Sequence, residues 1–242
     1  MSADAAYLAL LLDAPLQSWG FASRFQRRTT GLHPTKSGVI GLVCAAMGLA
    51  KGSAKEQEIL QELAKLILTT IAIPRHAVCR LEDFHTVGGG YDKKTQSQAI
   101  PRKASGGPCD NPTVSRRQYL ADARFGVILS GDRTLLDKAA VALQDPVWGV
   151  WFGRKSCIPA EPVFVELCES QDAAWKAILW VCKLSEKTLM ETFTSVTEVK
   201  AFDKGTDSLS DQPISFGDST SSGPDKRQFA VRHIRRVPGK SS

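Results

Sequence analysis

The sequence lacks the residue patterns that mark the commonest nucleotide and metal sites. Residues 31–41, GLHPTKSGVIG, set a Lys-Ser pair between glycines, but Thr35 and Thr30 stand where a nucleotide-binding P-loop requires glycine. The six cysteines include no CxxC pair, and the carboxylates form no DxD cluster. Neither pattern of metal ligands is present, and we therefore expect no metal and no cofactor.

Long apolar runs and targeting features are also missing. The N-terminal sequence MSADAAYLALLL has no positively charged start, and its apolar run is too short to span a membrane. Cys44 and Cys182 lie within apolar runs, which is typical of small core residues in a reduced protein. We expect a cytoplasmic protein with no membrane partner.

The chain carries an excess of positive charge. Its 242 residues include 31 Lys and Arg against 25 Asp and Glu, which gives a net charge of +6 and a pI near 9.0. A basic balance favours a polyanionic partner such as a nucleic acid. The 43% of apolar residues can supply the core of one large domain or two small ones.

The apolar periodicity predicts strands and helices in a recognisable order. Strands are expected over 7–12, 69–78, 121–131, 147–153 and 163–169, and helices over 37–49, 54–68, 135–145 and 173–182. Residues 13–31 are expected to form an irregular, exposed, basic connection. The order β-α-α-β-insert-β-α-β predicts an α+β protein with a ferredoxin-like βαββαβ domain. RNA-recognition modules have this fold, but so do many unrelated proteins.

The segment 31–41 is expected to begin a helix. Pro34 sets an extended entry, Thr35 or Ser37 can cap the helix, and Lys36 lies in its first turn. In one interpretation, the helix N-terminus and the lysine attract a backbone phosphate. In the other, the helix is simply capped and its lysine is solvated. The first interpretation is favoured by a cationic strip directly upstream: Arg24, Arg27 and Arg28.

The turn FGRKSC, residues 152–157, is a second candidate site. Arg154 and Lys155 are expected to follow a buried strand directly, so the two cations would lie at a sheet edge where a nucleic-acid backbone could bind. A turn between two apolar runs is commonly polar in any case. Both interpretations of this turn stay open.

Residues 85–118 form a long insertion rich in glycine and in positive charge. Its aromatic residues Phe84, Tyr91 and Tyr119 lie near cations, an arrangement that can stack bases while the charges hold phosphates. The alternative is a disordered surface loop, which the glycine content also fits. The cations of this segment are Lys93, Lys94, Arg102, Lys103, Arg116 and Arg117.

Histidines offer the only route to an enzymatic interpretation. Metal-free RNA cleavage needs a base, an acid and a cation beside the phosphate. The candidates for the base are His33, His76, His85 and His233, but none has a spacing that places it beside a nucleophile. We therefore predict no catalytic residue.

Several separated blocks of the sequence resemble one known family. They are LLLDAPLQSWG, GLHPTKSGVIGLVCAAMG, EDFHTV, RRQYLADARFGV, LQDPVWGVWFGRKSC and KRQFAVR, in this order. The blocks resemble the CasD family, the subunits that bind the crRNA 5′ handle in the type I-E CRISPR surveillance complex Cascade. The likeness extends over most of the chain and is weakest over 88–115 and 170–225.

The resemblance implies a RAMP-type, RRM-like ferredoxin fold with an inserted β-hairpin thumb. Residues 1–79 and 119–157 would form the ferredoxin-like domain, 80–118 the thumb, and 158–242 a smaller C-terminal β-rich extension packed on that domain. The implied role is non-catalytic: the protein would bind and cap the crRNA 5′ handle in antiviral defence. The equivalent type I-C subunit is a metal-independent crRNA-processing endoribonuclease, which is the alternative. A general RNA-binding module would leave the ordered blocks unexplained.

The resemblance also implies partners and binding residues. The partners would be the crRNA 5′ handle, the Cascade backbone subunit, the Cascade large subunit and, through the complex, the target DNA. The RNA-binding residues we predict are Arg24, Arg27, Arg28, His33, Thr35, Lys36, Ser37, His85, Arg116, Arg117, Arg154 and Lys155. In the thumb we predict Tyr91, Lys93, Lys94, Arg102 and Lys103.

Overall fold

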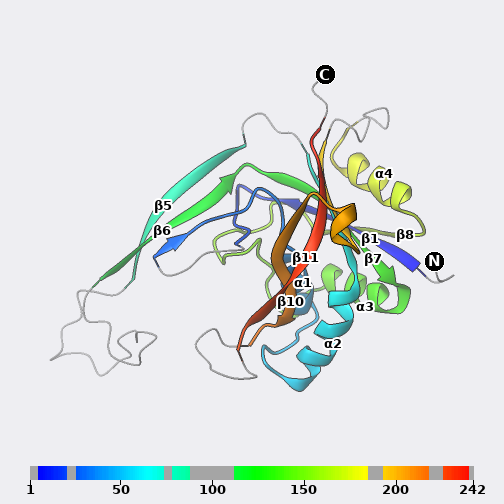
Figure 1. The fold of residues 1–242 in the computed structure, drawn as a ribbon, viewed down its shortest axis with the longest axis horizontal. Coiled ribbons are helices and arrows are strands. Elements are labelled where there is room, and N and C mark those ends of the chain that lie inside the picture. The colour runs from blue at the N-terminus through cyan, green and yellow to red at the C-terminus, as the bar shows by residue number, and fades with distance from the viewer. Residues whose placement is uncertain are drawn as a thin grey trace.

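An antiparallel sheet runs through the middle of the molecule (Figure 1). The computed structural model describes residues 5–20, 26–73, 78–87, 112–184, 193–217 and 226–239. Within these residues the sheet has seven strands in the order β10-β11-β9-β4-β7-β1-β8. Their bounds are β1 Ala5–Asp13, β4 Ile67–Ala72, β7 Arg124–Asp132, β8 Phe164–Cys168, β9 Thr194–Val199, β10 Asp207–Ser215 and β11 Gln228–Val237. The predicted α+β class is confirmed.

Helices cover both faces of the central strands, which explains the unbroken apolar run at the N-terminus. Leu8, Leu10 and Leu12 of β1 pack on one face against helices α1 (Lys36–Ala46), α2 (Ala54–Lys65) and α3 (Arg133–Gln144). Ala9 and Leu11 pack on the other face beneath α4 (Gln171–Val181). A strand buried on both sides needs apolar residues at every position rather than at alternate positions. No helix in the described ranges has the length and apolar character needed to span a lipid bilayer.

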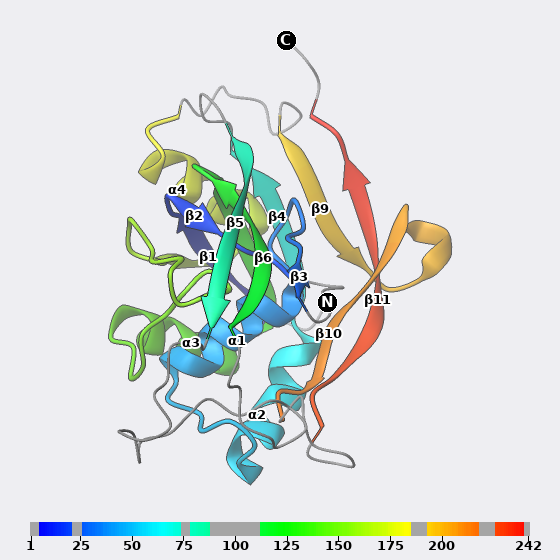
Figure 2. The ribbon, with the colours of Figure 1, turned by 90° about the vertical axis from the view of Figure 1, so that its left-hand side faces the viewer.

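A two-stranded hairpin extends outward from this body in Figure 1 and lies in front of it in Figure 2. Strands β5 (Cys79–Val87) and β6 (Thr113–Ala121) pair antiparallel along their whole length, and every residue of β5 is exposed. The other edge of β6 pairs with two short strands, β2 (Leu16–Gln17) and β3 (Arg27–Arg28). The middle of the predicted insertion, with Tyr91, Lys93, Lys94, Arg102 and Lys103, lies outside the described residues.

Helix α1 starts where the sequence predicted, and its glycines allow close packing. Thr35 caps the helix, because its side chain accepts a hydrogen bond from the backbone N–H of Gly38. A Cβ atom at Gly38 would lie 2.9 Å from the ring of Trp19. Gly48 follows the helix with a φ of +68°, a backbone conformation that favours glycine. The thin side of this helix therefore contacts the connection that follows β1.

Three of the predicted elements differ in the structure. Residues 147–153 form an irregular loop instead of a strand, and β8 is the strand that lies beside β1. The loop bonds to the end of α1 through the Val147 N–H and the Ala46 carbonyl, 2.9 Å apart. Helix α2 ends at Lys65, because residues from Ile67 onward pair with β7. The connection 13–31 is not uniformly exposed, since Gln17 and Trp19 are buried in the core.

A network of two ion pairs joins α1 to the C-terminal strands. The Lys36 ammonium lies 2.8 Å from the Glu198 carboxylate of β9. The Lys36 backbone N–H donates to Asp211 of β10, whose carboxylate also accepts two bonds from the Arg232 guanidinium of β11. Burial lowers the pKa of Lys36, and the Glu198 carboxylate beside it opposes that shift. These contacts hold the first turn of the helix against β9, β10 and β11.

Removing one partner of this network should be strongly destabilising. In a Lys36→Met variant the Glu198 carboxylate loses its cation in a largely dry site, so we expect the free energy of unfolding to fall by about 3 kcal/mol. The double variant Lys36→Met/Glu198→Gln should recover most of the loss. Urea unfolding followed by circular dichroism measures both changes.

The matched control is Lys65→Met, which removes an exposed pair with Glu62 and should cost below about 0.5 kcal/mol. Equal losses for Lys36→Met and Lys65→Met would show that the buried pair contributes no more than a surface pair.

Candidate nucleic-acid interface

Four arginines lie side by side in pairs on the hairpin strand β6 and on the short strand β3. Strand β3 pairs parallel with β6, in a register that sets Arg27 beside Arg116 and Arg28 beside Arg117. Arg27, Arg28 and Arg116 are exposed, and Arg117 is half-buried. Because successive side chains of a strand point to opposite faces, these residues form two cationic pairs, one on each face of the β3–β6 ladder. We call the two pairs the arginine surface, and their charges suit a phosphate backbone. Arg24 lies outside the described residues.

Arg154 holds this surface together. Its guanidinium donates to the Gln118 carbonyl of β6 at 2.9 Å and to the Arg28 carbonyl of β3 at 3.1 Å. It also lies 4.5 Å from the centroid of the Tyr119 ring. Two of its five N–H donors and one face of the guanidinium are therefore directed at the protein. We conclude that Arg154 positions the neighbouring arginines on β3 and β6.

The hairpin adds an aromatic ring to the same surface. The Arg116 guanidinium lies 5.4 Å from the centroid of the Phe84 ring on β5, and both side chains are exposed. Next to Phe84, His85 is exposed as well, and its backbone carbonyl accepts a hydrogen bond from Ser115. An exposed ring beside cations can stack a base while the cations bind its phosphate.

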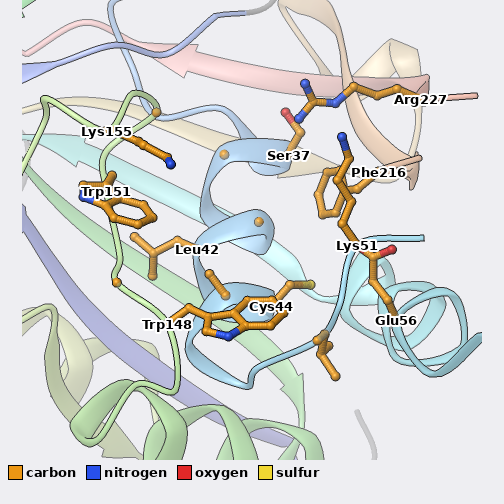
Figure 3. A pocket seen from close by; sticks show the side chains of 16 residues that line it. Ser37, Leu42, Cys44, Lys51, Glu56, Trp148, Trp151, Lys155, Phe216 and Arg227 are labelled. Atoms are coloured by element: carbon orange, nitrogen blue, oxygen red, sulfur yellow. The ribbon is translucent and has the colours of Figure 1, made fainter. Parts of the chain in front are cut away.

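A cleft of about 340 Å³ opens over the thin side of α1 (Figure 3). Trp148 and Trp151 reach the cleft from the loop after α3. The exposed fraction is 43% for Trp148 and 37% for Trp151. Lys155 lies on the same side as Trp151, 5.9 Å from its ring centroid, and Lys51 and Arg227 come from the opposite side. Indole rings with three surrounding cations match the chemistry of a single-stranded nucleotide.

One glycine fixes the loop that carries these tryptophans. Gly153 has a φ of +98°, and a Cβ atom there would lie 1.8 Å from the Ser18 carbonyl oxygen. The Ser18 N–H donates to the Phe152 carbonyl at 2.9 Å, and the Phe152 ring stacks on Trp19. The FGRKSC turn is therefore pinned to the connection after β1, which sets Arg154 toward the hairpin and Lys155 toward the cleft.

The start of α1 differs from the expected phosphate site. Lys36 is fully buried and paired with Glu198, so the prediction that this lysine is presented to a phosphate is wrong. Thr35 is buried as the helix cap. The Asp211 carboxylate already accepts a hydrogen bond from the Lys36 backbone N–H at the start of the helix. Of the predicted residues in this turn, Ser37 alone lines the cleft.

Two candidate reactive side chains, Cys44 and His33, have shifted pKa values. Burial, together with the nearby Glu56 carboxylate, raises the pKa of Cys44 to about 12, so this cleft thiol stays protonated at neutral pH. Burial and the charge of Arg236 lower the pKa of His33 to about 4. Within the described ranges, no three His, Cys, Asp or Glu side chains gather as metal ligands.

The low pKa of His33 predicts a pH dependence of stability. The ordinary value is 6.5 and the folded value is about 4, so the unfolded chain binds the proton more readily. Stability should hold above pH 6.5 and fall toward pH 4, by about 2 kcal/mol at about pH 5. Urea unfolding at about pH 7.5 and about pH 5 measures this loss.

A His33→Gln variant has no titrating ring and should lose about 2 kcal/mol less than the wild type over the same pH interval. Parallel pH profiles for the two proteins would contradict the assignment of this loss to His33.

Comparison with known proteins gives a consistent relationship. Residues 7–235 match the sequence model of the family described as CRISPR-associated protein (Cas_Cas5). The CRISPR system Cascade subunit CasD of Escherichia coli (strain K12) is 29% identical over 181 residues, 72% of this chain and 75% of that protein.

Solved structures agree with the sequence relationship. A chain described as CRISPR RNA-guided surveillance complex superimposes with a TM-score of 0.71 and 28% identity, covering 96% of this chain and 90% of its own. A second chain, described as a Cas protein, superimposes with a TM-score of 0.62 and 29% identity, and the match covers 96% of this chain and 95% of that one. Since the family match extends over nearly the whole chain, the protein belongs to the CRISPR-associated protein (Cas_Cas5) family and is a relative of CasD.

Proposed function

We propose that this protein is a non-catalytic subunit of a type I-E-like CRISPR surveillance complex that binds and caps the 5′ handle of the crRNA. The observation that carries the proposal is the arginine surface on β3 and β6, where Arg27 and Arg28 lie in register with Arg116 and Arg117. The cleft with its exposed tryptophans extends the same chemistry over α1. Relatedness to a Cascade subunit supports this role in cytoplasmic antiviral defence.

We propose further that the core is a ferredoxin-like domain of the RAMP type. The strand order β8-β1-β7-β4, with α1 and α3 on one face, supports this assignment. In this proposal, residues 80–118 act as the thumb, which is consistent with the projecting β5–β6 ladder. Strands β9, β10 and β11 form the C-terminal part, and they continue the sheet beyond β4.

The proposed partners follow from this arrangement. The arginine surface and the cleft would bind the crRNA 5′ handle, and the exposed hairpin would contact the backbone subunit that coats the guide. The large subunit would be the second protein neighbour, and target DNA would be reached only through the assembled complex. The exposed apolar residues of the hairpin, Leu81, Phe84, Val87 and Val114, suit contact with such neighbours.

Binding to the handle should depend on salt through the arginine surface. We expect the affinity for single-stranded repeat RNA to fall with salt, with a log–log slope near −0.7 for each phosphate contact. The variants Arg27→Gln/Arg28→Gln and Arg116→Gln/Arg117→Gln should each flatten the slope by up to about 1.4, because each removes two contacts. Fluorescence anisotropy from about 50 to about 300 mM salt measures the slopes.

Lys65→Gln/Lys138→Gln is the charge-matched control, because it also removes two charges, from exposed lysines on α2 and α3 away from the hairpin. Equal slopes for the wild type, both arginine variants and the control would show that RNA does not bind this surface.

A type I-C-like, metal-independent endoribonuclease is the alternative. Its best base in the described residues would be His33, since it is neutral at pH 7 and lines a cavity together with Arg80, Arg232 and Arg236. A base with a pKa of about 4 is poorly matched to proton abstraction at neutral pH. We therefore expect repeat RNA to stay intact when incubated with the purified protein in EDTA.

Denaturing gel electrophoresis and end-group analysis test this expectation. Specific cleavage that leaves a 2′,3′-cyclic phosphate, and that disappears in His33→Gln, would establish the alternative and reject the non-catalytic role. His233→Gln serves as the matched control, because His233 lies on β11 with its ring bonded to Ser208.

A further inference from the structure

A second, smaller cavity lies between the base of the hairpin and β11. Its volume is about 200 Å³, well above the ~15 Å³ that one enclosed water needs. The segment 30–35 forms one wall, Val196 and Leu209 line it from β9 and β10, and three arginines complete it: Arg80, Arg232 and Arg236. We call it the Arg232 pocket.

Two buried polar atoms of this pocket lack a hydrogen-bond partner among the described residues. Arg232 is 5% exposed, and its Nε and Nη2 atoms both donate to Asp211. This pairing uses one side of the planar guanidinium, so the Nη1 atom with its two hydrogens is buried and unpaired. The Nδ1 atom of His33 is buried and unpaired as well. A buried donor without an acceptor is costly, so these atoms call for a ligand.

The balance of charge specifies an anion. Asp211 neutralises Arg232, and Glu198 neutralises Lys36 behind it. Arg80 and Arg236 remain on the rim, where the facing carboxylate is Asp207, 3.7 Å from the Arg236 guanidinium. The pocket therefore keeps an excess of positive charge. Arginine side chains bind tetrahedral oxyanions through paired hydrogen bonds, which favours phosphate.

The position of the pocket identifies the source of that phosphate. The segment 30–35 follows Arg27 and Arg28 directly, and Arg80 lies on β5, paired with Leu120 of β6. The pocket thus continues the arginine surface from the hairpin toward β11. An RNA backbone that follows β3 would reach this cavity next, which favours a phosphodiester over the carboxylate of a protein partner.

We propose that the Arg232 pocket seats one phosphate group of the bound RNA, with Arg80, Arg232 and Arg236 as its donors. This inference rests on the proposed RNA-binding function. Arg232 Nη1 donates from the floor, Arg80 and Arg236 close over the oxyanion from the rim, and His33 donates from Nδ1 in the corresponding neutral tautomer. The pocket fixes one phosphate in place, whereas the exposed arginines of the hairpin attract the backbone more generally.

The test uses the full-length chain, the variants Arg80→Gln and Arg236→Gln, and a matched control. Arg235→Gln removes an equal charge from the neighbouring position on β11, where the side chain is exposed and its guanidinium bonds to the Lys204 carbonyl. The first probe is inorganic phosphate, compared with chloride at equal ionic strength. The imidazole ¹⁵N and ¹H resonances of His33 report binding by NMR.

The wild type and Arg235→Gln should show a saturable shift of the His33 resonances with phosphate and none with chloride. Arg80→Gln and Arg236→Gln should weaken that response. The second probe is single-stranded repeat RNA. Loss of one charged hydrogen bond should weaken its binding by about tenfold and flatten the salt slope by about 0.7 in the pocket variants alone.

The outcomes separate this inference from the proposed function. Wild-type RNA binding with no phosphate response at His33, or with equal losses in all three variants, would overturn the pocket and leave the RNA-binding function standing. A wild type that binds phosphate at His33 but binds no RNA would keep the phosphate site and reject the RNA function. The variant Arg232→Lys tests the donor at the bottom of the pocket. It keeps the charge opposite Asp211 but removes the Nη1 atom, so it too should weaken the phosphate response.

Discussion

The structure depends on the buried network that ties the first turn of α1 to the C-terminal strands. Lys36 pairs with Glu198, and Asp211 bridges the Lys36 backbone N–H and the Arg232 guanidinium. The two contacts of Lys36 span 162 and 175 residues of sequence, so they link the first part of the chain to the last. A buried ion network that is only partly formed costs more than it contributes, and this cost favours the single arrangement in which every partner is present.

This network changes how the molecule can bind an anion. A free helix N-terminus is an anion site, but here Asp211 occupies it from inside the protein. The cations available to RNA therefore lie outside the first turn, and they include those on β3, β6 and the loop that carries Lys155. The same Asp211 orients Arg232, so that one edge of the guanidinium is paired and the other is left for a ligand. The network thus closes one anion site and prepares another.

Local periodicity predicted the helices α1 to α4 and the strands β1, β4, β7 and β8. The hairpin and the C-terminal strands were expected only from the family resemblance, and the failure at 147–153 has a physical cause. The run 147–153 has the apolar content of a strand, but Gly153 takes a left-handed conformation and the tryptophans turn outward into the cleft. A short run of apolar residues such as this one does not distinguish a strand from a surface loop that carries aromatic side chains. Lys36 shows the limit for site residues: its ion-pair partner lies 162 residues away, and no local pattern reveals that pairing.

The arginine surface shows which binding residues can be predicted from the sequence and which cannot. Arg27, Arg28, Arg116 and Arg117 stood out by charge, but only the β3–β6 register brings them together. Arg80, Arg232 and Arg236 are ordinary arginines in strand sequences, and the fold alone makes them line one cavity. Exposed arginines on paired strand edges can attract a flexible backbone at many positions. A buried guanidinium held by Asp211 has one orientation, so it can recognise a phosphate at one position only. The first property supplies salt-dependent attraction and the second supplies register, which together would let one surface hold a guide RNA in a defined place.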